Sequence, residues 1–273
     1  MVIDFDGTPV LGEARRALTV GFFGTSIMEH LEAVNTQMTD QANLPEVGSR
    51  VTVERWAQRG WVHRLALSLR AAWPHIAFDV RNHGKGGATS RDIAGIVEAN
   101  RSTTNTDYDL VFLGCGINDV WRYFQGRMTE AVGIKEYARH LTGILDQLSG
   151  YSRRIIVVSE TPFGPIENPA TVTAMNAELA RYNEVAHAAA AAHGTLFLDV
   201  WAPFTAVARL IGDPAALWSD GVHLTELGDT VLLQQVEQLL AEHGIIEELL
   251  DCPFSGAPGR TDGVHHVHHV RSS

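Results

Sequence analysis

The sequence predicts a three-layer α/β/α sandwich, in which about five parallel strands form a sheet covered by helices on both faces. Short, nearly continuous apolar runs recur along the chain, as expected of strands that are buried on both faces. These runs alternate with segments of helical periodicity, and such alternation is typical of a parallel sheet. With 273 residues, of which 45% are hydrophobic, the chain can bury the core of one domain of this kind.

Five strands and five helices account for this alternation. The strands are expected at residues 17–24, 76–82, 109–116, 154–160 and 195–200. The helices are expected at residues 61–73, 89–100, 134–149, 171–193 and 225–243. The fourth helix is rich in alanine, and Gly194 directly after it is a typical C-terminal signal.

Three segments do not fit the alternation. Residues 1–16 form an N-terminal extension to a domain that spans residues 17–250. An irregular insertion at residues 35–60 follows the first strand, where loops that cover a site often lie. The segment 251–273 is rich in Gly, Pro, Ser and His and is expected to be a flexible tail. Its "HHVHHV" run can bind metal adventitiously, but no physiological metal site is predicted.

Composition and charge exclude several classes of partner. The formal charge of −11 argues against nucleic acid or an anionic membrane as the main partner, because both require a basic surface. No run approaches the roughly 20 apolar residues that a membrane span needs. Cys115 and Cys252 cannot form a disulfide framework, so a reducing compartment is expected. We therefore expect a soluble, cytoplasmic protein.

Polar residues suited to acyl transfer follow several of the predicted strands, where ligands bind in open parallel sheets. Ester hydrolysis requires a nucleophile, a base, a group that orients the base, and donors for the oxyanion. Ser26 follows the first strand, and its N–H at a helix start can also serve as a donor. His223 lies three residues after Asp220, so one turn can bring carboxylate and imidazole together. Gly87 permits close backbone approach, and the amide of Asn118 supplies a further donor.

Four short motifs occur in an order and spacing that resemble those of the SGNH (GDSL-type) hydrolases. They are "GTS" at 24–26, "NHGKGGATS" at 82–90, "GIND" at 116–119 and "DGVH" at 220–223. The resemblance covers about residues 17–243. It implies a flavodoxin-like sheet, no cofactor, and esterase or lipase activity.

The resemblance also implies a role for each matching residue. Ser26 corresponds to the nucleophile, His223 to the base, and Asp220 to the residue that orients the base. Ser26, Gly87 and Asn118 correspond to the oxyanion donors. The substrate is then a small-molecule ester, with acylated sugars, lipids and other metabolites all compatible.

One position departs from the family pattern. The residue before the nucleophile is usually Asp, which braces the loop, and here it is Thr25. Thr can cap a turn but brings no charge, so the departure concerns loop geometry more than reaction type. Gly87 is preferred to Gly84 and Gly86 by alignment with the family's N-x-x-x-x-G-x-T pattern.

Residues adjacent to the motifs have structural as well as functional interpretations. Thr25, Trp121 and Trp218 are candidates for substrate contact, although core packing explains the two tryptophans equally well. Asp119 is expected to anchor its loop, and Cys115 to be a packed thiol. The "DGVH" motif recurs at 262–265, but only the first copy precedes an amphipathic helix.

Three alternative functions remain at this point. The same acyl-enzyme could pass its acyl group to an alcohol or amine, which would make the protein an acyltransferase. The chain could also be a ligand-binding module without activity. The segment "DFDGT" resembles the first motif of haloacid-dehalogenase-type phosphatases, with Asp4 as nucleophile. However, the strand before it would be very short, Pro9 interrupts the segment, and no Lys follows Lys135.

Overall fold

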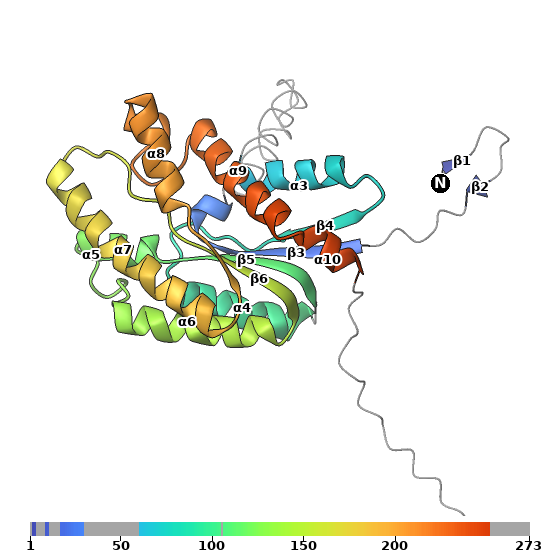
Figure 1. The fold of residues 1–273 in the computed structure, drawn as a ribbon. Helices are drawn as coiled ribbons and strands as arrows, with labels where there is room; N and C mark the ends of the chain where they lie inside the picture. The colour runs from blue at the N-terminus through green and yellow to red at the C-terminus, as the bar shows by residue number, and fades with distance from the viewer. Residues whose placement is uncertain (1, 4–8, 11–16, 30–59, 105, 252–273) are drawn as a thin grey trace, which may run out of the picture.

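A computed structural model describes residues 2–3, 9–10, 17–29, 60–104 and 106–251 of the chain. Its centre is a five-stranded sheet in which every neighbouring pair of strands is parallel (Figure 1). The strands are β3 (Ala17–Gly24), β4 (Ala77–Asn82), β5 (Tyr108–Gly114), β6 (Ser152–Val158) and β7 (Leu196–Leu198).

The order of the strands across the sheet is β4-β3-β5-β6-β7. The chain therefore starts near one side, adds β4 at that edge, and then reverses to add the remaining strands on the other side of β3. This is the order of flavodoxin-like folds, and it creates a crevice at the carboxyl ends of β3 and β5, where the direction changes. The predicted fold class is confirmed.

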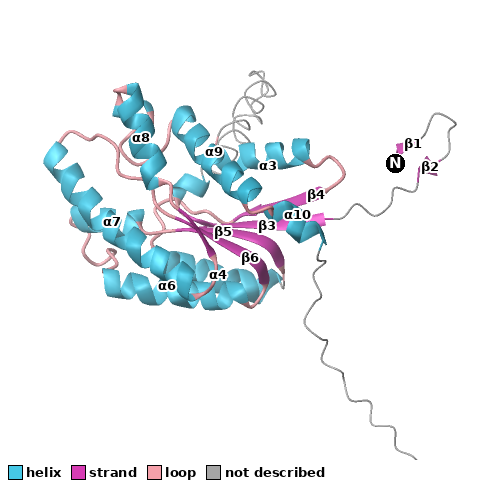
Figure 2. Cartoon of the chain, in the orientation of Figure 1, coloured by secondary structure: helices cyan, strands magenta, loops and turns pink. Residues whose placement is uncertain are grey.

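Helices cover both faces of the sheet (Figure 2). One face carries α4 (Ser90–Thr104), α5 (Ile117–Phe124), α6 (Ile134–Ser149) and α7 (Pro169–Ala192). The other carries α3 (Trp61–Ala72), α8 (Trp201–Ile211), α9 (Glu226–Glu242) and α10 (Ile245–Asp251). A short 3-10 helix, η1 (Pro214–Ala216), follows α8.

The core lies between the sheet and its helices and is rich in aromatic side chains near the predicted site. Phe22 of β3 stacks on Phe112 of β5, with ring centroids 4.9 Å apart. Trp61, the first residue of α3, contacts both rings edge-on. All three side chains are almost fully buried, and they fix α3 against the two central strands.

Each of the five predicted strands and five predicted helices is present, with ends that differ by a few residues. Gly194 has a φ of +62° just beyond α7, as its C-terminal role requires. Three helices were not predicted. The eight-residue α5 and seven-residue α10 are too short to show a clear period. In α8, Pro203 falls in the first turn, where no intrahelical N–H bond is lost.

Most residues of the three irregular segments lie outside the described parts of the chain. At the N-terminus, β1 (Val2–Ile3) pairs antiparallel with β2 (Pro9–Val10), apart from the main sheet. Asp4, residues 30–59 of the region that includes the expected insertion, and residues 252–273 of the tail lie outside the description. Within the described ranges, no helix is long and apolar enough to cross a bilayer.

Candidate active site

Three of the predicted motifs meet at the carboxyl edge of the central strands. Gly24 at the end of β3 lies beside Gly114 at the end of β5. The Gly24 carbonyl also accepts a hydrogen bond of 2.9 Å from the N–H of Lys85, in the loop after β4. The segments that carry Ser26, Gly87 and Asn118 therefore leave the sheet side by side.

The fourth motif brings an imidazole to Ser26. His223 Nε2 lies 3.0 Å from the Ser26 hydroxyl oxygen, and its Nδ1 lies 2.7 Å from Asp220 Oδ2. The other Asp220 oxygen, Oδ1, accepts the backbone N–H groups of Val222 (3.0 Å) and His223 (2.8 Å). The turn between Asp220 and His223 thus fixes the carboxylate against one ring nitrogen and leaves the other facing the serine.

Hydrogen bonding keeps the Asp220 carboxylate ionised. Partial burial alone would raise its pKa. The bonds from the His223 ring and from the backbone of His223 and Val222 outweigh this effect and hold the pKa below its ordinary value. An ionised acceptor at Nδ1 selects the tautomer whose proton is on Nδ1, so Nε2 is left as a free base.

The turn that carries Ser26 is held from three sides. Residues 26–29 begin a helix, and the Thr25 carbonyl accepts the N–H groups of Met28 and Glu29. The indole of Trp61 donates to the Ile27 carbonyl at 3.1 Å, and Asn82 donates to the Met28 carbonyl at 2.7 Å. The half-buried serine hydroxyl is therefore carried by a rigid turn.

Asp229 supports this arrangement from a distance. It lies in α9, is 2% exposed, and accepts the N–H groups of Gly60 and Trp61 at the start of α3. Burial raises its pKa to about 7. The carboxyl thereby caps a helix that has no capping side chain of its own. It also fixes Trp61, whose indole donates to the turn that carries Ser26.

The Gly87 loop is fixed by an arginine from α5. Gly87 has a φ of +71°, in the left-handed region that favours glycine. Its carbonyl accepts a hydrogen bond of 3.0 Å from Arg122 Nη2. Among the described residues, its N–H meets no acceptor, whereas the N–H of Gly84 is bound to Asn82 Oδ1 at 2.9 Å. This difference favours Gly87 over Gly84 as a donor to a substrate.

Asn118 lies in the first turn of α5 and is 1% exposed. One proton of its side-chain amide is donated to the Ala88 carbonyl at 2.9 Å. This bond orients the amide group toward the Gly87 loop, and the second amide proton remains for another acceptor. Asn118 and Arg122 are one helical turn apart, so both link the same face of α5 to that loop.

Two buried acids fix the start of α5. Asp119 accepts the backbone N–H of Ser90 at 2.9 Å and also the Ser90 hydroxyl, which ties α5 to α4. Glu160, at the end of β6, accepts the N–H of Ile117. Burial raises the pKa of Asp119 to about 7 and that of Glu160 to about 8. Both are positioned behind Asn118, not in contact with the reacting groups.

The remaining candidates are mostly packing residues. Thr25 is buried, and its hydroxyl accepts the Ile27 N–H at 3.5 Å, so it caps the turn, as its chemistry allows. Cys115 is buried, and burial raises its thiol pKa well above the ordinary value, as expected of a packed thiol. Trp121 is half-buried beside the guanidinium of Arg122. Trp218 is 5% exposed and forms part of the wall of a cavity.

The supporting residues Arg122, Trp61, Asp229 and Glu160 were not identified from the sequence. Only Arg122 has a local signal, because it lies four residues after Asn118 in a segment that forms a helix. The others act through contacts between elements that are distant along the chain. Across the residues that the structure describes, no group of three or more His, Cys, Asp or Glu side chains could hold a metal ion.

Comparison with known proteins places the chain in a family. Residues 22–231 match the model of the GDSL-like lipase/acylhydrolase family. A search of curated proteins finds no match.

Solved structures with the same fold include acetyl esterases. A variant of Axe2, an acetyl-xylooligosaccharide esterase from Geobacillus stearothermophilus, is 25% identical, with a TM-score of 0.62 over 83% of this chain and 94% of that chain. Axe2 itself, described as an acetylxylan esterase, is 24% identical, with a TM-score of 0.62 over 85% of this chain and 97% of its own. LAE5, an α/β hydrolase from the metagenome of Lake Arreo in Spain, is 23% identical, with a TM-score of 0.61 over 84% and 96%.

The family match covers most of the chain and includes Ser26, Asn118 and His223. The structural relatives share the fold over most of their length. The chain belongs to the GDSL-like lipase/acylhydrolase family and is a carboxylic ester hydrolase.

Proposed function

We propose that the protein is a serine esterase that cleaves an O-acyl ester through an acyl-enzyme on Ser26. One observation carries this proposal: His223 lies between the Ser26 hydroxyl (3.0 Å) and the Asp220 carboxylate (2.7 Å). Both distances are those of hydrogen bonds, so the imidazole can accept the serine proton without rearrangement. Ser26, Asp220 and His223 are thus assigned as nucleophile, orienting acid and base.

Each step of the reaction uses a group that lies at the edge of the sheet. As Ser26 Oγ attacks the ester carbonyl, its proton passes to His223 Nε2, and Asp220 stabilises the imidazolium. The carbonyl oxygen becomes an oxyanion, which is bound by the N–H groups of Ser26 and Gly87 and the free amide proton of Asn118. Collapse of the tetrahedral intermediate breaks the ester bond, and His223 returns the proton to the leaving alkoxide. Water then repeats the sequence on the acyl-enzyme and releases the acid.

The relatives give independent support for these roles. Solved variants of Axe2 described as catalytic mutants replace a serine, an aspartate and a histidine by alanine, and that aspartate and histidine are three positions apart. Asp220 and His223 have the same spacing. Acetylated sugars are the substrate class named for Axe2, so a small acyl group is the first to test here.

Replacing Ser26 with alanine tests the proposal. The Ser26→Ala variant is expected to lose at least about 1000-fold in kcat for p-nitrophenyl acetate, while its circular dichroism spectrum stays that of the wild type. A variant that retains wild-type turnover would refute the role of Ser26.

A further inference from the structure

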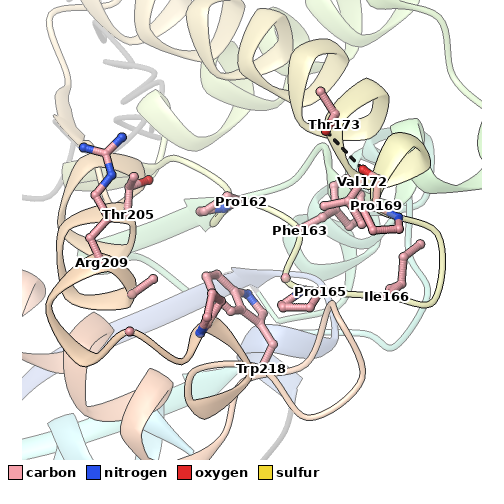
Figure 3. Close-up of a pocket in the computed structure, with 14 residues that line it drawn as sticks. Pro162, Phe163, Pro165, Ile166, Pro169, Val172, Thr173, Thr205, Arg209 and Trp218 are labelled. Carbon is pink, nitrogen blue, oxygen red and sulfur yellow. Dashed lines mark hydrogen bonds between the residues drawn. The ribbon is translucent and has the colours of Figure 1, made fainter.

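A cavity of about 550 Å³ is lined in part by Trp218, two residues before Asp220 in the sequence (Figure 3). The loop after β6, the start of α7, one side of α8 and Trp218 form its walls. Its volume is in the range that holds a small organic molecule. None of the five residues assigned to the reaction forms part of its wall.

The wall is apolar and contains few free hydrogen-bonding groups. It includes the side chains Pro162, Phe163, Pro165, Ile166, Val172 and Trp218. The hydroxyls of Thr173 and Thr205 also reach the wall, but each donates to a carbonyl of its own helix, at 3.0 and 2.9 Å. Arg209 is the one charged residue in the wall, and it forms no ion pair with another described residue.

This chemistry suits an apolar group better than a sugar. A sugar ring presents several hydroxyls, and each hydroxyl that is buried without a partner costs about 1–3 kcal/mol. A hydrocarbon ring or branched chain has no such requirement and gains about 25 cal/mol for each Å² of surface that it buries. Ile166, which lines the cavity and is 38% exposed, extends the apolar character to the surface.

The loop that lines the cavity contacts the turn between Asp220 and His223 directly. The N–H of Gly164 donates to the carbonyl of Gly221 at 2.8 Å. Gly221 has a φ of +88°, and a Cβ there would lie 2.5 Å from a methyl group of Ile166. The loop and the turn are therefore in close contact, and Trp218 lies two residues before Asp220 on the same segment.

The position of the cavity indicates which half of an ester it would take. His223 must protonate the leaving alkoxide, so the alcohol half of the ester lies on the side of His223. The proposed oxyanion donors lie on the loops after β4, β3 and β5, whereas the loop that lines the cavity follows β6, the next strand in the sheet. The turn of the base contacts both regions, because His223 is bonded to Ser26 and Gly221 accepts the N–H of Gly164 in the cavity wall.

We propose that this cavity binds the alcohol half of the substrate and selects esters of apolar, ring-sized alcohols. The proposal rests on the proposed function, because it assigns His223 to the departing alcohol. It implies that this enzyme differs from its acetylxylan-esterase relatives in the alcohol that it prefers.

Filling the cavity tests the proposal. Ala208→Trp places an indole in the wall from α8, and Val172→Trp does so from α7. Ala206→Trp is the matched control, since Ala206 is exposed on the same helix and does not line the cavity. The three substrates are methyl acetate, 1-naphthyl acetate, which has a large alcohol, and methyl octanoate, which has a long acyl chain. Calorimetric binding of 1-naphthol to each protein is measured in parallel.

The expected result is selective. Ala208→Trp and Val172→Trp lower kcat/KM for 1-naphthyl acetate by at least about tenfold, mainly through KM, and weaken 1-naphthol binding by a similar factor. Both esters of methanol, and every measurement on Ala206→Trp, stay within about twofold of the wild type.

The following outcomes overturn the proposal. A loss confined to methyl octanoate would make the cavity an acyl site, and unchanged values in all assays would mean that the cavity takes no part in binding. The binding assay separates this inference from the proposed function. If the wild type hydrolyses none of the esters, the proposed function fails. In that case, 1-naphthol binding that is weakened in Ala208→Trp still supports the cavity as the binding site of the alcohol. If the wild type does not bind 1-naphthol, the proposal that the cavity binds the alcohol half is contradicted.

Discussion

Replacing Gly87 with alanine tests the proposed oxyanion site. The substitution should lower the free energy of unfolding for two reasons, and it should also lower kcat. The left-handed backbone, with φ of +71°, costs alanine about 1–2 kcal/mol. The new methyl group would lie 2.6 Å from Arg122 Nη2, so the guanidinium must move. When the guanidinium moves, its hydrogen bond of 3.0 Å to the Gly87 carbonyl is lost. The loss of such a charge-assisted bond costs about 1.5–3 kcal/mol.

The free energy of unfolding of Gly87→Ala is therefore expected to fall by between about 2.5 and 5 kcal/mol. Gly126→Ala is the matched control. Gly126 has a nearly identical φ of +73°, and a Cβ there meets nothing within 4 Å. The control should lose only the backbone part, about 1–2 kcal/mol. Urea unfolding followed by circular dichroism measures both values.

Activity distinguishes the two variants more sharply. Displacing the Gly87 loop moves one proposed oxyanion donor, which is expected to lower kcat for p-nitrophenyl acetate by about 100- to 1000-fold. Gly126→Ala should keep the wild-type kcat, measured under conditions in which both variants are folded. If the kcat values of the two variants agree within about threefold, the role of Gly87 as a donor is wrong.

Three further substitutions test the neighbouring groups. Asn118→Ala removes the amide donor and should lower kcat for p-nitrophenyl acetate by about 100- to 1000-fold with little change in KM, and a kcat near that of the wild type would exclude the amide from the oxyanion site. Asp220→Asn should lower kcat by about three to four orders of magnitude, because asparagine does not select the His223 tautomer with its proton on Nδ1. A loss of less than about tenfold would contradict the role of Asp220 in orienting His223. The pKa of Glu160 is about 8 in the folded protein, whereas its ordinary value is 4.5. Above pH 4.5 the unfolded chain loses this proton and the folded protein keeps it, so the stability that is complete below pH 4.5 is lost as the pH rises to about 8. In urea titrations, the free energy of unfolding should therefore fall less between pH 5 and pH 8 in Glu160→Gln than in the wild type, by more than about 1 kcal/mol. An equal fall in both proteins would mean that Glu160 is ionised over this whole pH range.

The residues proposed to act chemically were predictable because each follows a recognisable local pattern. Ser26 and Asn118 come directly after buried apolar runs, and the spacing of Asp220 and His223 fits a single turn. The order of the strands places these patterns at one edge of the sheet, so the sequence and the fold class together define the site.

The groups that hold the site rigid were not predictable in the same way. Asp229 caps α3 from α9, and Trp61 donates from α3 to the turn of Ser26. These contacts depend on how helices pack across the sheet, which no local pattern specifies. The cavity beside Trp218 is likewise formed by the loop after β6, α7 and α8, and α8 itself was not predicted.

Hydrolysis and acyl transfer share the acyl-enzyme and differ in the group that accepts the acyl chain. Product analysis in the presence of a competing alcohol separates them, since a transferase forms the new ester in preference to the free acid. The half-exposed side chains of Asp220 and His223 leave the base open to solvent, which favours water as the acceptor.

The covalent intermediate is the most direct test of the proposed chemistry. The wild type and the Ser26→Ala variant would each be mixed with p-nitrophenyl acetate, quenched in acid within the first turnover, and digested for mass spectrometry. We predict one acetyl group on the peptide that contains Ser26 in the wild type and none in the variant. Acetylation of a different residue that is kinetically competent for turnover, or full hydrolysis with no acetyl group on Ser26, would contradict the account.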